Sequence, residues 1–285
     1  MKSVGLIGLG LLGSALADRL IACGWSVTGF DIDHDRRQSL IAAGGTAVRS
    51  LSEITSFDLI LLSLPTSLIV SEVVSKLEPD LRAGQTIVDT TTGSPGDVEL
   101  MAAKLAQHGV EYLDATIGGS SQQARDGQAI IMCGGSDDGF TQCRGLFDDL
   151  ANKSFLVGPV GSGSRMKLAV NLVLGLNRAV LAEGLAFAGK LGLDPALTLE
   201  VLKAGPARSQ VMDTKGEKML RSDFEPQARL AQHLKDVQLI LQAGSAADAH
   251  LPLSTMHREL LTELVRTGRG DLDNSAIIEA FRQTK

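Results

Sequence analysis

The sequence has few cysteines, few aromatic residues and no excess of basic charge, and each scarcity excludes a class of protein. Cys23, Cys133 and Cys143 form no Cys-x-x-Cys pair, which argues against a disulfide scaffold or a zinc site and favours a reducing compartment. Five histidines without His-Glu-x-x-His spacing give no sign of a metal site. The formal net charge is −6, and no basic run with interleaved aromatic residues indicates a nucleic-acid partner.

Long uninterrupted hydrophobic runs are also missing. The apolar segment after Lys2 is broken by glycines and continues into Asp18 and Arg19, so we do not interpret it as a signal peptide. No uncharged run approaches the length that spans a bilayer. We therefore expect a cytoplasmic protein without a membrane partner. A hydrophobic content of 44% in 285 residues is enough for two domains or one large one.

The most informative segment is a glycine-rich turn between an apolar run and a helix-like segment. Residues 3–13 read SVGLIGLGLLG, in which Gly8, Gly10 and Gly13 form a Gly-x-Gly-x-x-Gly set. Such glycines permit a tight strand-to-helix turn, a close approach of a pyrophosphate and close packing of the helix on the strand. The N–H groups of the first helical turn can then bind the phosphates. The segment therefore predicts a dinucleotide site.

An acidic residue follows the next predicted strand. Asp31 comes 18 residues after Gly13, close to the spacing of about 20 expected for a carboxylate that binds the adenosine ribose. Its charge would repel the 2′-phosphate of NADP, so the sequence favours NAD, with NADP as the weaker candidate. Arg36 and Arg37 could lie near such a phosphate, but we expect them to be solvated on the next helix.

The first part of the chain alternates short apolar runs with helix-like segments. This alternation predicts an α/β fold with a doubly wound, mostly parallel sheet of the Rossmann type. The expected strands are residues 4–7, 25–30, 58–64, 85–89, 110–114, 128–133 and 154–157, and the expected helices are residues 11–23, 65–77, 95–108 and 137–150.

The pattern changes after residues 158–163, a Gly-rich stretch that we interpret as a linker or hinge. No strand pattern follows it. One long helix is expected over residues 164–191, and another begins at Pro195 with Asp194 as its N-cap. The predicted domains are a dinucleotide-binding domain over residues 1–161 and an all-α domain over residues 162–285 that binds substrate or joins subunits.

Lys167 is the best candidate for a catalytic acid or base. Hydride transfer at an alcohol carbon requires a group that exchanges the hydroxyl proton, and no Ser-x-x-x-Tyr-x-x-x-Lys arrangement supplies one. Lys167 lies early in the predicted long helix, where the two domains should meet, and Asn171 shares its helix face one turn later. From spacing alone, a lysine with a solvated ammonium group is the stronger interpretation.

Five motifs are distributed over nearly the whole length of the chain. They are GLIGLGLLGSALADRLIACG (5–24), DATIGGS (114–120), GSGSRMKLAVN (161–171), AEGLAFAGKLGLDP (182–195) and HLKDVQL (233–239). Together they resemble the 3-hydroxyisobutyrate dehydrogenase family, the β-hydroxyacid dehydrogenases, although Leu12 stands where methionine is usual in that family. The resemblance implies a Rossmann domain followed by an all-α domain, and hydride transfer between NAD(H) and a small β-hydroxyacid or its semialdehyde.

The same resemblance implies roles for individual residues. Lys167 would be the catalytic lysine and Asn171 its companion amide, and Lys235 would add positive charge near both cofactor and substrate. The substrate carboxylate would lie at Gly118, Gly119, Ser120 and Ser121. The residues expected along the cofactor are Gly8, Leu9, Gly10, Leu11, Leu12, Gly13, Asp31, Ile32, Leu64, Pro65, Thr66, Thr92 and Lys235.

One motif departs from the family pattern. The substrate motif usually ends in Ser-Gly-Gly, whereas residues 118–123 read GGSSQQ. The hydroxyl has moved and amides have been added, which favours a larger or more polar acid than 3-hydroxyisobutyrate.

Two other functions stay open. An imine reductase of similar architecture is one, although those enzymes typically lack the lysine. A non-catalytic NAD-binding module is the other. Helical domains of this kind commonly mediate assembly, so we expect a homodimer or homotetramer.

Overall fold

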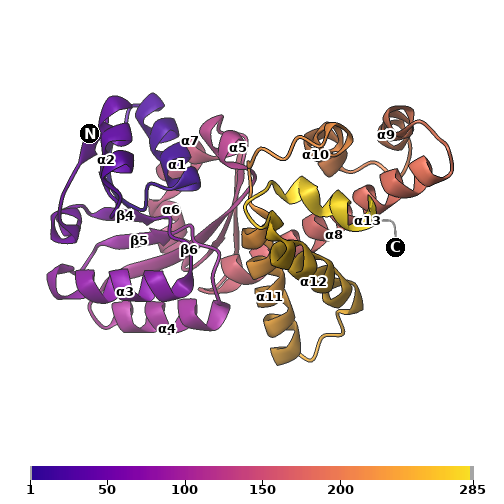
Figure 1. Cartoon of the computed structure of the whole chain (residues 1–285). Coiled ribbons are helices and arrows are strands. Elements are labelled where there is room, and N and C mark those ends of the chain that lie inside the picture. Colours follow the sequence, from indigo (N-terminus) through magenta and orange to yellow (C-terminus); the bar gives the residue numbers. More distant parts are fainter. Residues whose placement is uncertain (1, 283–285) are drawn as a thin grey trace. The chain divides into compact units, whose positions relative to one another are not determined.

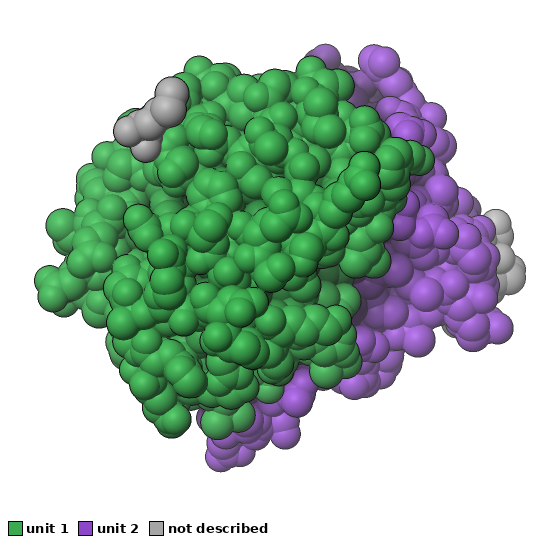
Figure 2. Space-filling model, turned by 90° about the vertical axis from the view of Figure 1, so that its left-hand side faces the viewer, with its two compact units in different colours: residues 1–167 green, residues 168–285 purple. Residues whose placement is uncertain are grey.

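The computed structural model describes residues 2–282. The chain divides into two compact units, Met1–Lys167 (unit 1) and Leu168–Lys285 (unit 2), which Figure 2 shows in separate colours. The predicted domain boundary between residues 161 and 162 stays a prediction.

Unit 1 contains an eight-stranded sheet with the order β3-β2-β1-β4-β5-β6-β7-β8. Neighbouring strands are parallel except for β6 and β7, which are antiparallel. The mostly parallel Rossmann sheet that the sequence predicts is confirmed. The strands are β1 Ser3–Ile7, β2 Ser26–Phe30, β3 Thr46–Ala47, β4 Leu59–Leu62, β5 Thr86–Asp89, β6 Glu111–Gly118, β7 Ile130–Gly134 and β8 Lys153–Gly158.

Helices cover both faces of this sheet, with α3 and α4 on one side and α1 and α2 on the other (Figure 1). Two hydrophobic clusters correspond to the two faces, one containing Leu16 and Phe147 and the other Val74 and Leu105. Strands buried on both faces need continuous apolar sequence, as in β4. The helical segments are α1 Leu11–Ala22, α2 His34–Ala42, η1 Leu51–Ser56, α3 Ser67–Leu77, η2 Glu78–Asp80, α4 Pro95–Ala106, α5 Ser121–Arg125, α6 Asp137–Gln142 and α7 Arg144–Leu150.

The structure corrects three local expectations. The single helix expected over residues 137–150 is two helices that meet at Cys143. Strand β6 continues to Gly118, four residues beyond the predicted end. The predicted linker is much shorter, because β8 extends to Gly158 and α8 already begins at Ser162.

Unit 2 is all-helical among its described residues, and the predicted all-α architecture of this part is confirmed. Helix α8 (Ser162–Lys190) begins in unit 1 and continues into unit 2. Asp194 caps the next helix as predicted, since it accepts hydrogen bonds from the N–H groups of Ala196 and Leu197. The remaining segments are α9 Pro195–Ala204, α10 Gln210–Arg221, α11 Leu230–Ala246, α12 Pro252–Leu264, η3 Val265–Arg269, η4 Asn274–Ile278 and α13 Glu279–Arg282.

Helix α8 is the one helix of the described chain that is long and apolar enough to cross a membrane by length and composition. In its most apolar stretch 44% of the residues are buried inside the protein. Its apolar side chains Leu181 and Leu185 belong to the core of unit 2, so a core helix explains the composition.

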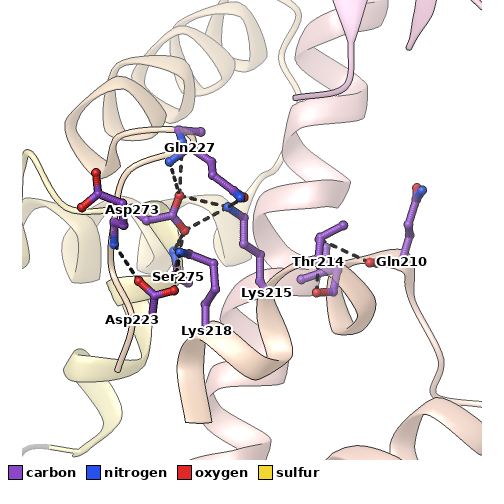
Figure 3. A network of polar contacts seen from close by, with 11 residues as sticks. Gln210, Thr214, Lys215, Lys218, Asp223, Gln227, Asp273 and Ser275 are labelled. Carbon is purple, nitrogen blue, oxygen red and sulfur yellow. Dashed lines mark hydrogen bonds and ion pairs between the residues drawn. The ribbon is translucent and has the colours of Figure 1, made fainter. Parts of the chain in front are cut away.

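A buried ion pair joins helix α10 to the C-terminal part of unit 2. Lys215 donates to both carboxylate oxygens of Asp273 at 2.9 Å, and Asp273 also accepts hydrogen bonds from the backbone N–H groups of Gln227 and Ser275. Figure 3 shows Lys215, Gln227 and Ser275 around the Asp273 carboxylate, with Lys218 and its ion-pair partner Asp223 nearby.

Candidate active site

The predicted cofactor segments of unit 1 all follow carboxyl ends of parallel strands, whereas Lys235 lies in helix α11 (Leu230–Ala246) of unit 2. Residues 8–13 follow β1, residues 31–32 follow β2, residues 64–66 follow β4, and Thr92 follows β5. Because these strands are parallel neighbours in the sheet, their carboxyl ends lie at one edge. The strand order reverses between β1 and β4, and ligands of open α/β sheets bind at such a point.

The three glycines of the turn have different surroundings. Gly8 has φ +95°, and a Cβ there would lie 2.2 Å from the Ser63 carbonyl oxygen. A Cβ on Gly13 would lie 1.9 Å from the carbonyl oxygen of Gly8. Gly10 differs, because the nearest atom to its Cβ position is the Arg36 guanidinium at 3.9 Å. The fold itself requires two of the glycines, and the third leaves open space.

That open space lies at the beginning of α1, which fits a bound pyrophosphate. Gly10 is the N-cap residue and no side chain caps this helix, so its first N–H groups are available to phosphate oxygens. Ile32 and Leu11 are 91% and 64% exposed next to this turn. Apolar side chains in such positions can cover the rings of a bound dinucleotide.

Asp31 is buried with its carboxylate held in a defined orientation. Its Oδ2 accepts the N–H of Leu9 at 2.7 Å and its Oδ1 accepts the N–H of Asp33 at 2.9 Å. The Arg36 guanidinium lies 3.5 Å from Oδ2, so a cation is closer to this carboxylate than the sequence-based interpretation assumed. The carboxylate is thereby fixed beside the glycine turn.

Two further predicted loops are joined through Thr91 and Asp89. The Thr91 hydroxyl accepts the N–H of Leu64 at 3.1 Å, and Asp89 accepts the N–H of Thr91 at 2.8 Å. Tyr112 donates its hydroxyl to Asp89 at 2.6 Å. Burial raises the pKa of Asp89, against the lowering effect of these hydrogen bonds. This buried chain of contacts fixes the loops that carry residues 64–66 and Thr92.

The Lys167 ammonium donates to the backbone carbonyl of Ile117 at 2.7 Å. Ile117 lies near the carboxyl end of β6, which is parallel to β5. Lys167 therefore lies at the same edge of the sheet as the predicted cofactor segments. It is also next to residues 118–121, the predicted substrate loop.

In the substrate loop, the side chains that depart from the family pattern make hydrogen bonds within the loop and helix α5. The Ser120 hydroxyl accepts the N–H of Gln123, and the Gln123 amide oxygen accepts the N–H of Ser120. This reciprocal arrangement is a capping box for α5. Gln122 donates to both carboxylate oxygens of Asp126 at 3.0 Å. The two added amides therefore stabilise the loop.

Asn171 and Lys235, both in unit 2, are brought together by Asp236. Asn171 donates its Nδ2 to Asp236 Oδ2 at 3.1 Å, and Lys235 Nζ lies 3.7 Å from Asp236 Oδ1. An acceptor-only carboxylate fixes which end of the amide it binds, so the carbonyl end of Asn171 is directed away from Asp236. Lys235 and Asp236 form a partly buried ion pair on α11.

Sequence reasoning missed the supporting residues Asp89, Asp114, Ile117 and Asp236. Ile117 contributes only its backbone carbonyl, for which no sequence signal exists. Asp89 ends β5 and Asp114 follows the apolar Leu113 in β6, and the two residues are 2% and 1% exposed. Because buried carboxylates need partners, an acid at the end of an apolar run is the signal that could have found them.

Comparison with known proteins agrees with this arrangement. Residues 3–158 match the NAD binding domain of 6-phosphogluconate dehydrogenase, and residues 161–281 match the NAD-binding model of NADP-dependent 3-hydroxyisobutyrate dehydrogenase. The chain therefore contains NAD-binding domains.

Individual relatives cover almost the whole chain. The 2-hydroxy-3-oxopropionate reductase of Escherichia coli is 32% identical over 98% of this chain and 96% of its own length. The 2-(hydroxymethyl)glutarate dehydrogenase of Eubacterium barkeri is also 32% identical, over 98% and 95%. A Mycobacterium tuberculosis 3-hydroxyisobutyrate dehydrogenase solved with L-serine superposes with a TM-score of 0.91 at 25% identity, over 99% of this chain and all of that one. This chain belongs to the 3-hydroxyisobutyrate dehydrogenase family, the β-hydroxyacid dehydrogenases, which are NAD(P)-dependent oxidoreductases.

Proposed function

We propose that this protein transfers hydride between NAD(H) and a small β-hydroxyacid or its semialdehyde, with Lys167 as the proton-transfer group. The observation that carries the proposal is the 2.7 Å contact of Lys167 Nζ with the Ile117 carbonyl. This contact holds an amine at the sheet edge where the cofactor segments converge. The names of two relatives support the substrate class, because each describes a carboxylic acid whose β carbon is an aldehyde or an alcohol.

The roles of the two α8 side chains follow from their chemistry. Bound NAD(H) supplies or accepts the hydride. Lys167 donates a proton to the aldehyde oxygen during reduction and accepts the hydroxyl proton during oxidation. Asn171, one turn later on α8, binds the same oxygen, with its amide oriented by Asp236.

The backbone of Gly118 and Gly119 and the side chain of Ser121 bind the substrate carboxylate. The Ser120 hydroxyl is excluded from this role in our proposal, because it caps α5. The positive charge that the family resemblance implies for Lys235 stays part of the proposal on that ground alone. The preference for an acid larger or more polar than 3-hydroxyisobutyrate stays part of the proposal.

NAD is the preferred cofactor in this proposal. The Asp31 carboxylate, fixed by Leu9 and Asp33, is suited to accept the ribose hydroxyls and disfavours a 2′-phosphate. The nearby Arg36 partly offsets that charge, so we expect measurable activity with NADP. The ratio of kcat/KM with the two cofactors measures this preference.

Self-association completes the proposal. Val173, Val180 and Phe187 recur every seven residues on α8 and are 57%, 66% and 63% exposed, so they share one side of the helix. A homodimer or homotetramer would cover this stripe. Light scattering on the wild type and on Phe187→Glu tests it, since a charge in the stripe should lower the mass. A cytoplasmic location rests on the sequence alone.

The decisive assay is a panel of hydroxyacids and semialdehydes run with NAD and with NADP, with a cyclic imine beside them. We expect turnover on carboxylates that carry a β-hydroxyl or a β-aldehyde. Turnover of the imine and of no hydroxyacid or semialdehyde would contradict the proposal and indicate an imine reductase. Tight NADH binding without turnover of any compound would indicate a non-catalytic NAD-binding module.

A further inference from the structure

Asp114 is a buried acid whose carboxylate holds the beginning of helix α8. Its Oδ1 accepts the N–H of Gly161 at 2.8 Å and its Oδ2 accepts the N–H of Ser164 at 2.7 Å. The first N–H groups of a helix have no partners within the helix, and the positive end of the helix dipole favours a negative charge there. One side chain of β6 therefore fixes both the residue before α8 and its first turn.

The same strand holds the lysine that α8 carries. Lys167 lies one turn after Ser164, and its ammonium donates to Ile117, three residues after Asp114 along β6. The beginning of α8 and the ammonium group of Lys167 are thus both held by hydrogen bonds to β6. Because the backbone between them is a hydrogen-bonded helix, a shift of the capped end is transmitted to the lysine.

We propose that Asp114 is a positioning residue for Lys167, which keeps the ammonium against the Ile117 carbonyl by capping the N–H groups of Gly161 and Ser164. The proposal rests on the proposed function where it concerns turnover. The position of the lysine can be measured independently of turnover.

Burial of the Asp114 carboxylate makes the anchoring dependent on pH. Asp89 is its neighbour on β5, Tyr112 lies on its own strand, Lys167 comes from α8, and Cys133 lies on β7 opposite the adjacent Ala115. Burial raises the pKa of Asp114 to about 6, against the lowering effect of the backbone hydrogen bonds. Burial also raises the pKa values of Tyr112 and Cys133, so both are neutral at pH 6. A protonated Asp114 has one acceptor oxygen fewer for the two N–H donors.

Asp114→Asn tests the proposal because it preserves shape and offers one oxygen for two donors. We expect kcat to fall by roughly tenfold to a hundredfold, as for a misplaced catalytic group, with the KM for NADH little changed. The matched control is Thr116→Val on the same face of β6. Thr116 donates its hydroxyl to the carbonyls of Met132 and Gly163, so its loss leaves both capped N–H groups paired and should lower kcat much less than Asp114→Asn does.

The pH profile separates positioning from a general loss of structure. In the reduction direction Lys167 must be protonated, so acid does not deplete its active form. We expect kcat of the wild type to fall below about pH 6 and kcat of Asp114→Asn to be low and flat in that range. An acid limb at the same pH in Asp114→Asn would overturn the proposal.

Two measurements need no turnover. Hydrogen exchange of the peptide containing residues 159–167 should be faster by at least about tenfold in Asp114→Asn than in Thr116→Val. Acetylation of Lys167, measured by mass spectrometry, should also be faster in Asp114→Asn than in Thr116→Val. Unchanged exchange and acetylation would overturn the proposal even if kcat fell. If instead both change while Lys167→Gln retains full turnover, the anchoring holds and the proposed function fails.

Discussion

The two units each contain a buried aspartate at a helix junction, and the partners of these aspartates differ. Asp273 in unit 2 pairs with the Lys215 ammonium and accepts several backbone N–H groups. Asp114 in unit 1 accepts the backbone N–H groups of Gly161 and Ser164. Burial tends to raise both pKa values. The hydrogen bond and charge of Lys215 outweigh it and lower the pKa of Asp273, whereas that of Asp114 rises to about 6.

The hydrogen-bond and charge partners of a buried aspartate determine the pH range in which it is ionised. With a full counter-charge, Asp273 is ionised throughout the physiological range and holds unit 2 together. With partial charges from backbone N–H groups, Asp114 is anionic only above about pH 6. Such an acid reduces stability at neutral pH, and it lies where the proposed catalytic lysine is positioned.

The largest expected effect comes from removing the counter-charge of Asp273. Lys215→Met leaves a buried carboxylate unpaired and should lower the free energy of unfolding by about 3–5 kcal/mol. Lys218→Met is the matched control on the same helix, because Lys218 pairs with the exposed Asp223, and it should cost less than about 1 kcal/mol. Urea denaturation measures both. Equal costs for the two variants would mean that the buried pair is no stronger than the surface pair.

The pH dependence of stability should have different forms at the two aspartates. Asp114 has a folded-state pKa of about 6 against 3.8 for the ordinary carboxyl, so its contribution is fully present below pH 3.8 and lost as pH rises through 6. Between pH 4 and 7, Asp114→Asn should gain up to about 3 kcal/mol relative to the wild type.

Asp273 has a lowered pKa, so its contribution is present above pH 3.8 and lost only in stronger acid. The stability difference between Asp273→Asn and the wild type should therefore be flat between pH 5 and 7. Denaturation curves at several pH values test both expectations, and parallel curves for the two variants would contradict them.

A smaller effect is expected where α8 approaches β6 closely. A Cβ on Gly163 would lie 2.1 Å from the Asp114 carbonyl oxygen and 2.6 Å from that of Met132, so Gly163→Ala should cost about 1–3 kcal/mol by overpacking. Gly145→Ala in α7 is the control, since nothing lies within 4 Å of its Cβ position. It should be neutral or stabilising by up to about 1 kcal/mol. Thermal denaturation distinguishes the pair.

Local patterns made much of unit 1 predictable. The glycine turn and Asp31 were identified because the strand, turn, helix and acid follow one another closely in sequence. Asp114 could not be linked to Gly161 and Ser164, because these contacts join residues 47 and 50 positions apart. Periodicity and composition carry no signal for such pairs.

Composition also misled at one point. The composition of residues 158–163 predicts a linker or hinge, yet Gly163 is a helical residue that permits close backbone packing on β6. Glycine supplies both flexibility and close approach, and only the neighbouring strand distinguishes them. The catalytic role of Lys167 was predicted from the family resemblance, because spacing alone favoured a solvated side chain.

The most direct test of the account is single-turnover hydride transfer in Lys167→Gln, with NADH bound and an active semialdehyde from the panel mixed in. We expect hydride transfer to be slower by about 10²–10⁴-fold, as for loss of a general acid, with NADH affinity within about twofold of the wild type. Hydride transfer at close to the wild-type rate would contradict the assignment of Lys167 as the proton donor.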